Sequence, residues 1–207
     1  MKKGLFIVLE GPDGSGKTTV ADIVCDRLCE KGYEIVHTRE PGGIDIAEQI
    51  RSVILNPDNT AMDARTEALL YAASRRQHLV EKVIPAVSSG KIVICERFLY
   101  SSLAYQGKAR GIGFDPIISI NEFAINGTYP DVTIFLDVDE ETGQKRINSR
   151  TSKDRLDAES VNFHRLVNEG YREVLDRFKE TKIVDATRDL DTVVSDTLKL
   201  ILDSIND

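Results

Sequence analysis

The chain has 207 residues, of which 41% are hydrophobic and 29% charged, the balance of a globular protein with a sizeable core. Its formal net charge of −7 argues against a nucleic-acid polymer as partner, because binding one requires a basic face. No apolar run approaches the roughly 20 residues of a membrane span, and the run at residues 5–9 has no signal-peptide cleavage site, so we expect no membrane association.

Five short, mostly apolar runs predict the strands of a parallel sheet, at residues 5–9, 34–37, 91–95, 132–137 and 182–184. Helical patterns lie between them. They cover residues 20–28, 46–54, about 64–87 with a break near Pro85, and 193–202. This alternation predicts an α/β fold, three-layered and doubly wound around a five-stranded parallel sheet. Because no linker divides the chain, we expect one domain over residues 1–207.

A phosphate-binding pattern, G-x-x-x-x-G-K-[ST], stands between the first strand and the first helix. Its glycines let backbone N–H groups approach phosphate oxygens, and the helix N-terminus adds partial positive charge. Lys17 is expected to reach the β- and γ-phosphates of ATP, and the Thr18 hydroxyl to bind Mg²⁺. The predicted ATP-binding residues of this P-loop are Gly11, Pro12, Asp13, Gly14, Ser15, Gly16, Lys17, Thr18 and Thr19.

Asp13 is unusual in an anion-binding loop, because a carboxylate repels phosphate. Two interpretations stay open. Asp13 either points to solvent or caps the helix, or it accepts a hydrogen bond from a second substrate, on the side away from the phosphates.

Residues after the second and third strands predict a second site, because ligands of such folds bind at the carboxyl ends of the strands. Arg39 and Glu40 precede Pro41 and two glycines, which form either a shaped binding loop or a plain turn. After the third strand, Glu96 can hold the metal, directly or through water. Arg97 can bind an acceptor phosphate and neutralise charge in the transition state.

The long helix and the segment after the third strand carry further candidates. Tyr71 and Arg75 share a helix face, where they could stack on a base and bind its edge, or could be a core residue and a solvated charge. Ser102, Tyr105 and Gln106 form one polar helix face beside the predicted site.

The cysteines and histidines show no metal-binding pattern. Cys25, Cys29 and Cys95 have no C-x-x-C spacing, so we expect them to be reduced packing residues, which fits a cytoplasmic location. His37, His78 and His164 show no ligand spacing, and we expect none of them to bind metal.

Several segments resemble the bacterial thymidylate kinase family along essentially the whole chain. They are residues 10–19, 38–43 (T-R-E-P-G-G), 65–68, 72–75, 101–107 (S-S-L-A-Y-Q-G) and 129–131. The second and fifth are far more specific than the P-loop. The resemblance implies a P-loop NTPase fold with a short lid at about 148–158. It further implies transfer of the γ-phosphoryl group of ATP to dTMP with Mg²⁺ as cofactor, giving dTDP and ADP, and a homodimer.

The resemblance also implies roles for single residues on the dTMP side. Arg39 and Arg97 would hold the dTMP phosphate, and Arg51 would help to position the loop and the acceptor phosphate. Asp13 would accept a hydrogen bond from the sugar 3′-hydroxyl. The residues expected around the nucleoside are Tyr71 stacked on thymine, Arg75 and Gln106 at its edge, Ser102 near the base, and Tyr105 crowding the 2′ position. Glu40 and Pro41 complete the substrate-binding set.

On the ATP side, the lid would close over the nucleotide and supply a transition-state arginine, since the P-loop carries none. The candidates are Arg150 and Arg155, which join Lys17 and Arg97 in the predicted catalytic set. Arg146 and the turn at residues 185–188 would lie near adenine.

Two departures from the family pattern keep other functions open. The family usually has Asp-Arg after the third strand, whereas this chain has Glu96 and Arg97, a pair similar to that of deoxynucleoside kinases. Many bacterial members also have Glu at the position of Asp13. The alternatives are a deoxynucleoside kinase, another nucleoside monophosphate kinase, and a P-loop switch ATPase that binds a protein partner.

Overall fold

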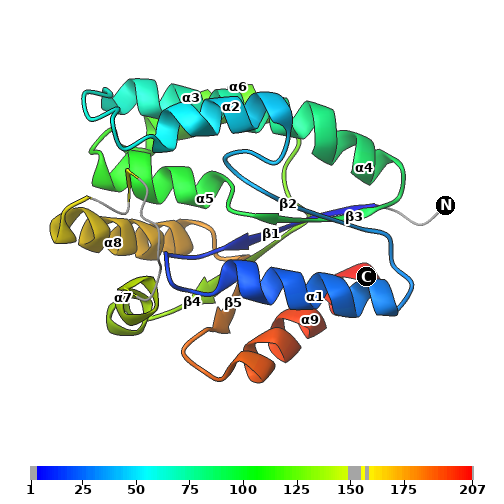
Figure 1. Ribbon diagram of the computed structural model, residues 1–207. Helices are drawn as coiled ribbons and strands as arrows, with labels where there is room; N and C mark the ends of the chain where they lie inside the picture. Colours follow the sequence, from blue (N-terminus) through cyan, green and yellow to red (C-terminus); the bar gives the residue numbers. More distant parts are fainter. Residues whose placement is uncertain (1–3, 149–154, 157–158, 207) are drawn as a thin grey trace.

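The central sheet consists of five parallel strands in the order β2-β3-β1-β4-β5 (Figure 1). The computed structural model describes residues 4–148, 155–156 and 159–206. Within them the strands are β1 (Leu5–Glu10), β2 (Ile35–Arg39), β3 (Ile92–Glu96), β4 (Val132–Asp137) and β5 (Lys182–Asp185). All five predicted strands are present, with ends within two residues of the predicted ones, and the doubly wound α/β fold is confirmed.

Helices cover both faces of this sheet. They are α1 (Lys17–Glu30), α2 (Asp45–Leu55), α3 (Ala64–His78), α4 (Ile84–Ser88), α5 (Leu99–Ser102), α6 (Phe114–Ile125), α7 (Glu140–Asn148), α8 (Val161–Arg177) and α9 (Leu190–Asn206), with π-helical segments η1 (Leu79–Val83) and η2 (Leu103–Ala109). Helices α1 and α9 lie on one side of the sheet, and α2, α3, α6 and α8 lie on the other (Figure 1). No described helix is long and apolar enough to cross a membrane.

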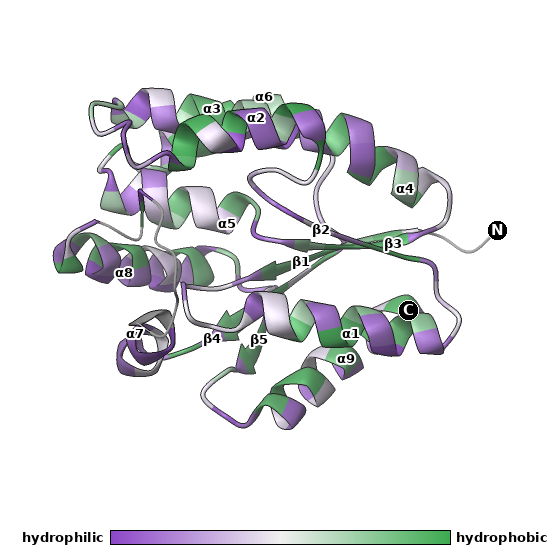
Figure 2. Cartoon of the chain, in the orientation of Figure 1, coloured by the Kyte–Doolittle hydropathy of each residue, from purple (hydrophilic) through white to green (hydrophobic). Residues whose placement is uncertain are grey.

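The side chains of β1 alternate between two hydrophobic cores. Leu5, Ile7 and Leu9 pack with α1 and α9, while Phe6 and Val8 pack with α3, η2 and α8 on the other face. This alternation follows from the period of two in a strand. Figure 2 shows the result, with hydrophobic colour along the strands and mixed colours on the helices. A strand that is buried on both faces reads as a continuous apolar run, which is why β1 was predictable.

The helical regions differ from the prediction in two ways. The sequence interpretation named no helix at α6, α7 or α8, all of which are present. The expected break at Pro85 is wrong, because helical backbone continues from α3 through η1 into α4. Pro85 lies in the first turn of α4, where it removes one backbone N–H donor without ending the helical run. The irregularity is instead the π-helical turn just before it.

The three cysteines are free, but they do not share one environment. Cys25 and Cys95 are buried, and burial raises the pKa of the Cys25 thiol to about 12. Cys29 is exposed on α1, so the expectation that it packs in the core is wrong.

The carboxyl ends of the central strands meet at one edge and position the site. The N–H of Glu40 donates to the carbonyl of Glu96 at 2.9 Å, and the N–H of Arg97 donates to the carbonyl of Leu9 at 2.9 Å. The ends of β2, β3 and β1 are thereby fixed to one another. The segments that follow them reach a common space, as the parallel topology requires.

Candidate active site

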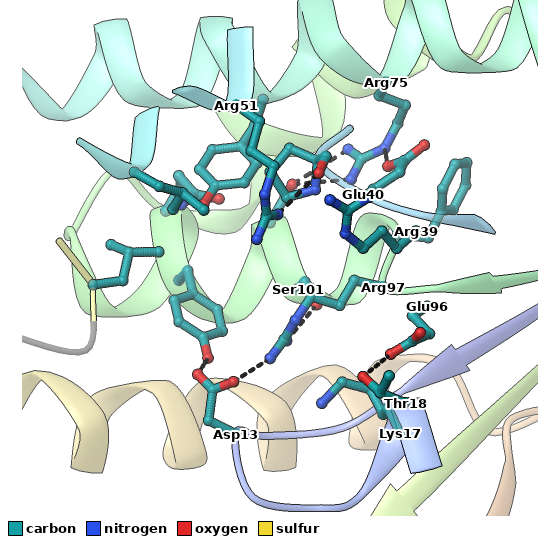
Figure 3. Close-up of a pocket in the computed structure, with 18 of the residues that line it drawn as sticks. Asp13, Lys17, Thr18, Arg39, Glu40, Arg51, Arg75, Glu96, Arg97 and Ser101 are labelled. Atoms are coloured by element: carbon teal, nitrogen blue, oxygen red, sulfur yellow. Dashed lines mark hydrogen bonds and ion pairs between the residues drawn. The ribbon is translucent and has the colours of Figure 1, made fainter. Parts of the chain in front are cut away.

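A cavity of about 570 Å³ opens at this edge of the sheet (Figure 3). The predicted residues that line it are Asp13, Gly14, Gly16, Lys17, Thr18, Thr19, Arg39, Glu40, Pro41, Arg51, Tyr71, Arg75, Glu96, Arg97, Ser102, Tyr105 and Gln106. Figure 3 shows Arg39 and Arg51 on the opposite side of the cavity from Lys17 and Thr18, with Arg97 between them. The structure thus brings most of the predicted ATP-side and acceptor-side residues into one space.

The P-loop connects β1 to α1 through backbone that favours glycine. Gly14 and Gly16 have φ values of 79° and 87°, in the left-handed region. The Lys17 ammonium lies inside the loop, 2.9 Å from the carbonyl oxygens of Gly11 and Pro12. Burial, together with repulsion from Arg97, lowers the pKa of Lys17 to about 7.

Glu96 and Thr18 form an oxygen pair at the mouth of the P-loop. The Thr18 hydroxyl donates to Glu96 Oε2 at 2.6 Å, and the other carboxylate oxygen lies 3.1 Å from His37 Nε2. Burial alone would raise the pKa of Glu96, but hydrogen bonds from His37 and Thr18 hold it below its usual value. A hydroxyl beside an ionised carboxylate is the donor set that Mg²⁺ prefers, so these residues fit that ion.

Asp13 belongs to the acceptor side, not to a helix cap. Its carboxylate lies 2.6 Å from Arg97 Nη2 and accepts from the Tyr105 hydroxyl at 2.5 Å. Arg97 itself has a φ of 67° and also donates to the hydroxyls of Ser101 and Tyr171, both at 3.1 Å. Asp13 therefore does not cap α1, and its two carboxylate oxygens bind Arg97 and Tyr105 in the wall of the cavity.

The loop after β2 is braced from α2. Arg39 forms an ion pair with Glu48 at 2.7 Å, and the Gly43 N–H donates to the same carboxylate at 2.7 Å. Arg51 Nη1 donates to the carbonyl of Pro41 at 2.9 Å, which matches the predicted role of Arg51 in positioning this loop. The segment is therefore a shaped loop, not a plain turn.

Arg75 is a buried charge in the cavity wall, which excludes the alternative of a solvated arginine. Its Nε donates to Glu40 Oε2 at 2.7 Å, and both terminal nitrogens contact the Ser102 hydroxyl. Nη1 also donates to Asn121 Oδ1. Glu40 was predicted to bind substrate, but its carboxylate binds Arg75, so it orients an arginine in the wall of the cavity.

A second group of buried residues continues this network. His78 Nδ1 lies 3.0 Å from the other carboxylate oxygen of Glu40, and its Nε2 lies 2.8 Å from the Thr38 hydroxyl. Ligand atoms of Glu40, His78 and Cys95 lie within 4.8 Å of one another, close enough for a metal ion. Because both ring nitrogens and both carboxylate oxygens already have hydrogen-bond partners, this cluster is better described as a hydrogen-bond network.

Neither predicted lid arginine is found among the described residues that line the cavity. Arg150 lies outside the described residues. Arg155 is buried, donating from Nε to the carbonyl of Ile54 at 2.7 Å and from Nη2 to Glu67 at 2.5 Å. It does not line the cavity, although its neighbour Leu156 does. The structure thus places Arg155 in a buried ion pair and not at the phosphate positions, because Glu67 offers it a desolvated carboxylate partner.

Four other predicted residues do not line the cavity. Arg146, on α7, donates from Nη1 to the carbonyls of Gly14 and Ala186, at 3.2 and 3.0 Å. It therefore connects the P-loop to the turn after β5. Gly11, Pro12 and Ser15 belong to the P-loop but do not line the cavity.

Buried acidic residues are the main group that sequence reasoning missed. Glu10 accepts from the backbone N–H groups of Phe98 and Ser101 at 2.7 and 3.1 Å and so fixes the segment after β3. Buried Glu67 holds Arg155, and Glu48, whose side chain is 41% exposed, holds Arg39. Only Glu10 had a visible signal, since it is a charged residue at the end of a buried strand. The histidines show no ligand spacing, so the contact of His37 with Glu96, 59 residues away, was not predicted.

Comparisons with known proteins agree with this geometry. The family model described as thymidylate kinase matches residues 9–197. The chain is 54% identical to the thymidylate kinase of Bacillus licheniformis, covering 99% of this chain and 98% of that one. It is 57% identical to that of Clostridium novyi, covering 93% and 96%. The crystal structure of thymidylate kinase from Ehrlichia chaffeensis matches with a TM-score of 0.77 at 30% identity, covering 96% and 98%.

Proposed function

The chain belongs to the thymidylate kinase family, and from that premise we propose that it transfers the γ-phosphoryl group of ATP to dTMP, giving dTDP and ADP. One observation carries the assignment to this cavity. Its P-loop end holds Lys17, its far end holds Arg75, and Arg97 lies between them. This is the order that a phosphate donor and a base-bearing acceptor require. Tyr71 and Gln106 also line the cavity.

On the donor side, backbone N–H groups of the P-loop bind the ATP phosphates, and Lys17 neutralises charge on the β- and γ-phosphates. Thr18 and Glu96 would hold Mg²⁺, which would supply positive charge to offset that of the phosphates. Arg146, which donates to the Gly14 carbonyl, supports the loop from the adenine side.

On the acceptor side, Arg39 and Arg97 bind the phosphate of dTMP. Asp13 lies 2.6 Å from Arg97 and so fixes the guanidinium while its own oxygens face the sugar. Tyr105, whose hydroxyl donates to Asp13, borders the 2′ position. Burial raises the pKa of Tyr105 well above its usual value, so this hydroxyl stays protonated and able to donate.

Catalysis then depends on positioning and charge stabilisation. The attacking phosphate oxygen is already anionic, so no strong general base is needed. Lys17 and Arg97 stabilise the charge that develops on the transferred group. Arg150 and Arg155 remain the proposed lid arginines of a lid at about 148–158. For Arg155, that role requires it to leave Glu67 and Ile54.

Glu96 also bears on the alternative of a deoxynucleoside kinase. Such an enzyme needs a base beside a neutral acceptor hydroxyl. Both oxygens of Glu96 instead contact Thr18 and His37, on the P-loop side of the cavity. With its arginines at the acceptor end, the cavity favours an acceptor that carries a phosphate.

A homodimer in the cytoplasm, formed by a single-domain chain, completes the proposal. Large hydrophobic side chains are exposed on the outer helices of one face, namely Ile46 and Val53 on α2, Leu69 on α3, Val80 on η1 and Phe123 on α6. These helices form one layer in Figure 1 and contact one another, so a second copy of the chain could cover them.

The test follows the γ-phosphate of labelled ATP with dTMP, with and without Mg²⁺, and separates the products by chromatography. Label in dTDP that depends on Mg²⁺ is the expected result. Label in inorganic phosphate alone, at a rate indifferent to dTMP, would identify an ATPase and contradict the proposal. The control is Lys17→Ala, which should abolish transfer, because nothing else in the P-loop carries positive charge to the β- and γ-phosphates.

A further inference from the structure

Glu67 on α3 is a buried carboxylate that does not line the cavity yet contacts a residue that does. Its side chain is 1% exposed. It accepts from Gln106 Nε2 at 2.9 Å, from Arg110 Nη2 at 3.1 Å and from Arg155 Nη2 at 2.5 Å. Burying an unpaired charge costs several kcal/mol. These three contacts offset that cost for Glu67.

The arginines keep Glu67 ionised. Burial would raise the pKa of this carboxyl group, but hydrogen bonds from Arg110, Gln106 and Arg155 hold it below its usual value. An ionised carboxylate can only accept hydrogen bonds. The amide group of Gln106 that faces Glu67 must therefore be the NH₂ and not the carbonyl.

The contact with Glu67 determines how the Gln106 amide is oriented toward the cavity. One N–H of Gln106 Nε2 is given to Glu67, which fixes the orientation of the amide. Nε2 keeps a second N–H, and Oε1 is the acceptor that this side chain can offer to a ligand in the cavity. Arg75, in the same wall, has only donors, and Glu40 and Ser102 fix its plane. The cavity thus presents one acceptor and one donor to the edge of a base.

This pair of groups distinguishes thymine and uracil from cytosine. The edge of thymine or uracil has a donor at N3 and an acceptor at O4, which complements Gln106 Oε1 and Arg75. The edge of cytosine has an acceptor at N3 and a donor amine at C4, so both contacts would fail. A site built to pair a buried polar edge rejects a mismatched one strongly, because its own groups are left unpaired.

We propose that Glu67 is a specificity-determining positioning residue. By fixing the Gln106 amide with its oxygen toward the cavity, it makes the enzyme reject cytosine nucleotides. Arg110 acts through it by keeping the carboxylate charged. This inference rests on the proposed function, since it presumes that the base of dTMP lies against Gln106 and Arg75.

The test compares kcat/KM for dTMP and dCMP in the wild type and in Glu67→Gln. The new amide can donate as well as accept, so Gln106 is free to turn, and the dTMP-to-dCMP ratio is expected to fall at least about tenfold. KM for ATP should stay unchanged. Glu173→Gln, which neutralises an exposed partner of Lys108 on the neighbouring η2–α8 contact, is the matched control and should keep the wild-type ratio.

A purely structural role would give a different result. Equal losses with dTMP and dCMP, at an unchanged ratio, would overturn the inference. If Glu67→Gln does not fold, Glu67→Asp answers the same question, because it keeps the charge for the arginines but is too short to reach Gln106 as well. A lower ratio in that variant supports the role, and an unchanged ratio overturns it. A wild type inactive on dTMP would instead contradict the proposed function.

Discussion

Arg97 is the residue on which the geometry of the site depends most. Its backbone φ of 67° is costly for a residue with a side chain, and the N–H bond to Leu9 holds it there. This conformation directs the guanidinium toward Asp13, Ser101 and Tyr171 instead of back along β3. The residue is therefore placed before substrate binds.

Replacing Arg97 by alanine should lower kcat/KM for dTMP by about 10² to 10³, as loss of other charge-stabilising groups does. Steady-state kinetics at saturating ATP measures this. Arg172→Ala, which removes a half-exposed arginine paired with Asp137, is the control and should change little. A wild-type rate in Arg97→Ala would show that Arg97 does not act on the acceptor phosphate.

The charge of Glu67 should also appear in the stability of the protein. Because its folded pKa lies below the usual value of about 4.5, the carboxylate stabilises the fold above that pH. The contribution is lost as pH falls through the lower folded pKa. The difference in unfolding free energy between wild type and Glu67→Gln should thus be largest near about pH 7 and shrink below about pH 4.5. A difference that is constant with pH would contradict a depressed pKa.

How far single residues were predictable depended on their partners. Lys17, Thr18 and Arg97 belong to short local patterns whose chemistry is readable, and all of them line the cavity. Glu67 and His37 act through partners 39 and 59 residues away, and no local pattern reveals such pairs. The role of Arg155 was implied by the family resemblance, but its partner Glu67 lies 88 residues away.

At the scale of elements, strands were easier to predict than helices. The strands are apolar runs. α8 also has an apolar face, with Phe163, Val167, Tyr171 and Val174 at helical spacing, but the sequence interpretation did not name it. α7 is largely polar, and its position depends on its partner. α7 shows this dependence, since it packs on the P-loop through Gly143. A Cβ on Gly14 would lie 2.3 Å from the Gly143 carbonyl oxygen.

Gly14→Ala should therefore be more destabilising than an alanine at another left-handed glycine. Gly111, with a φ of 73° and nothing within 4 Å of a built Cβ, is the matched site. Both variants have the cost of a left-handed alanine, but Gly14→Ala should lose about 1–3 kcal/mol more through overlap with α7. Urea unfolding without nucleotide measures the two free energies. Equal losses would mean that α7 moves away at no cost.

For the whole molecule, the outer layer of α2, α3 and α6 is the proposed dimer face. Phe123 on α6 is 89% exposed, the most of the large hydrophobic side chains on that layer. Phe123→Glu should convert a dimer of two 23.1 kDa chains into monomers, because an unpaired charge would be buried in the contact. Val161→Glu, on α8 and 81% exposed, is the control. Sedimentation would contradict the assignment if both variants stayed dimeric.

The identity of the acceptor tests the account most directly. ADP release with ATP and Mg²⁺ should be measured with dTMP, dUMP, TMP, thymidine, other nucleoside monophosphates, and no acceptor. The arginines at the acceptor end and the edge-reading pair Gln106 and Arg75 predict fast release with dTMP and little with thymidine or dCMP. A preference for thymidine would contradict the account, because the arginines of the cavity would then have no acceptor phosphate to bind.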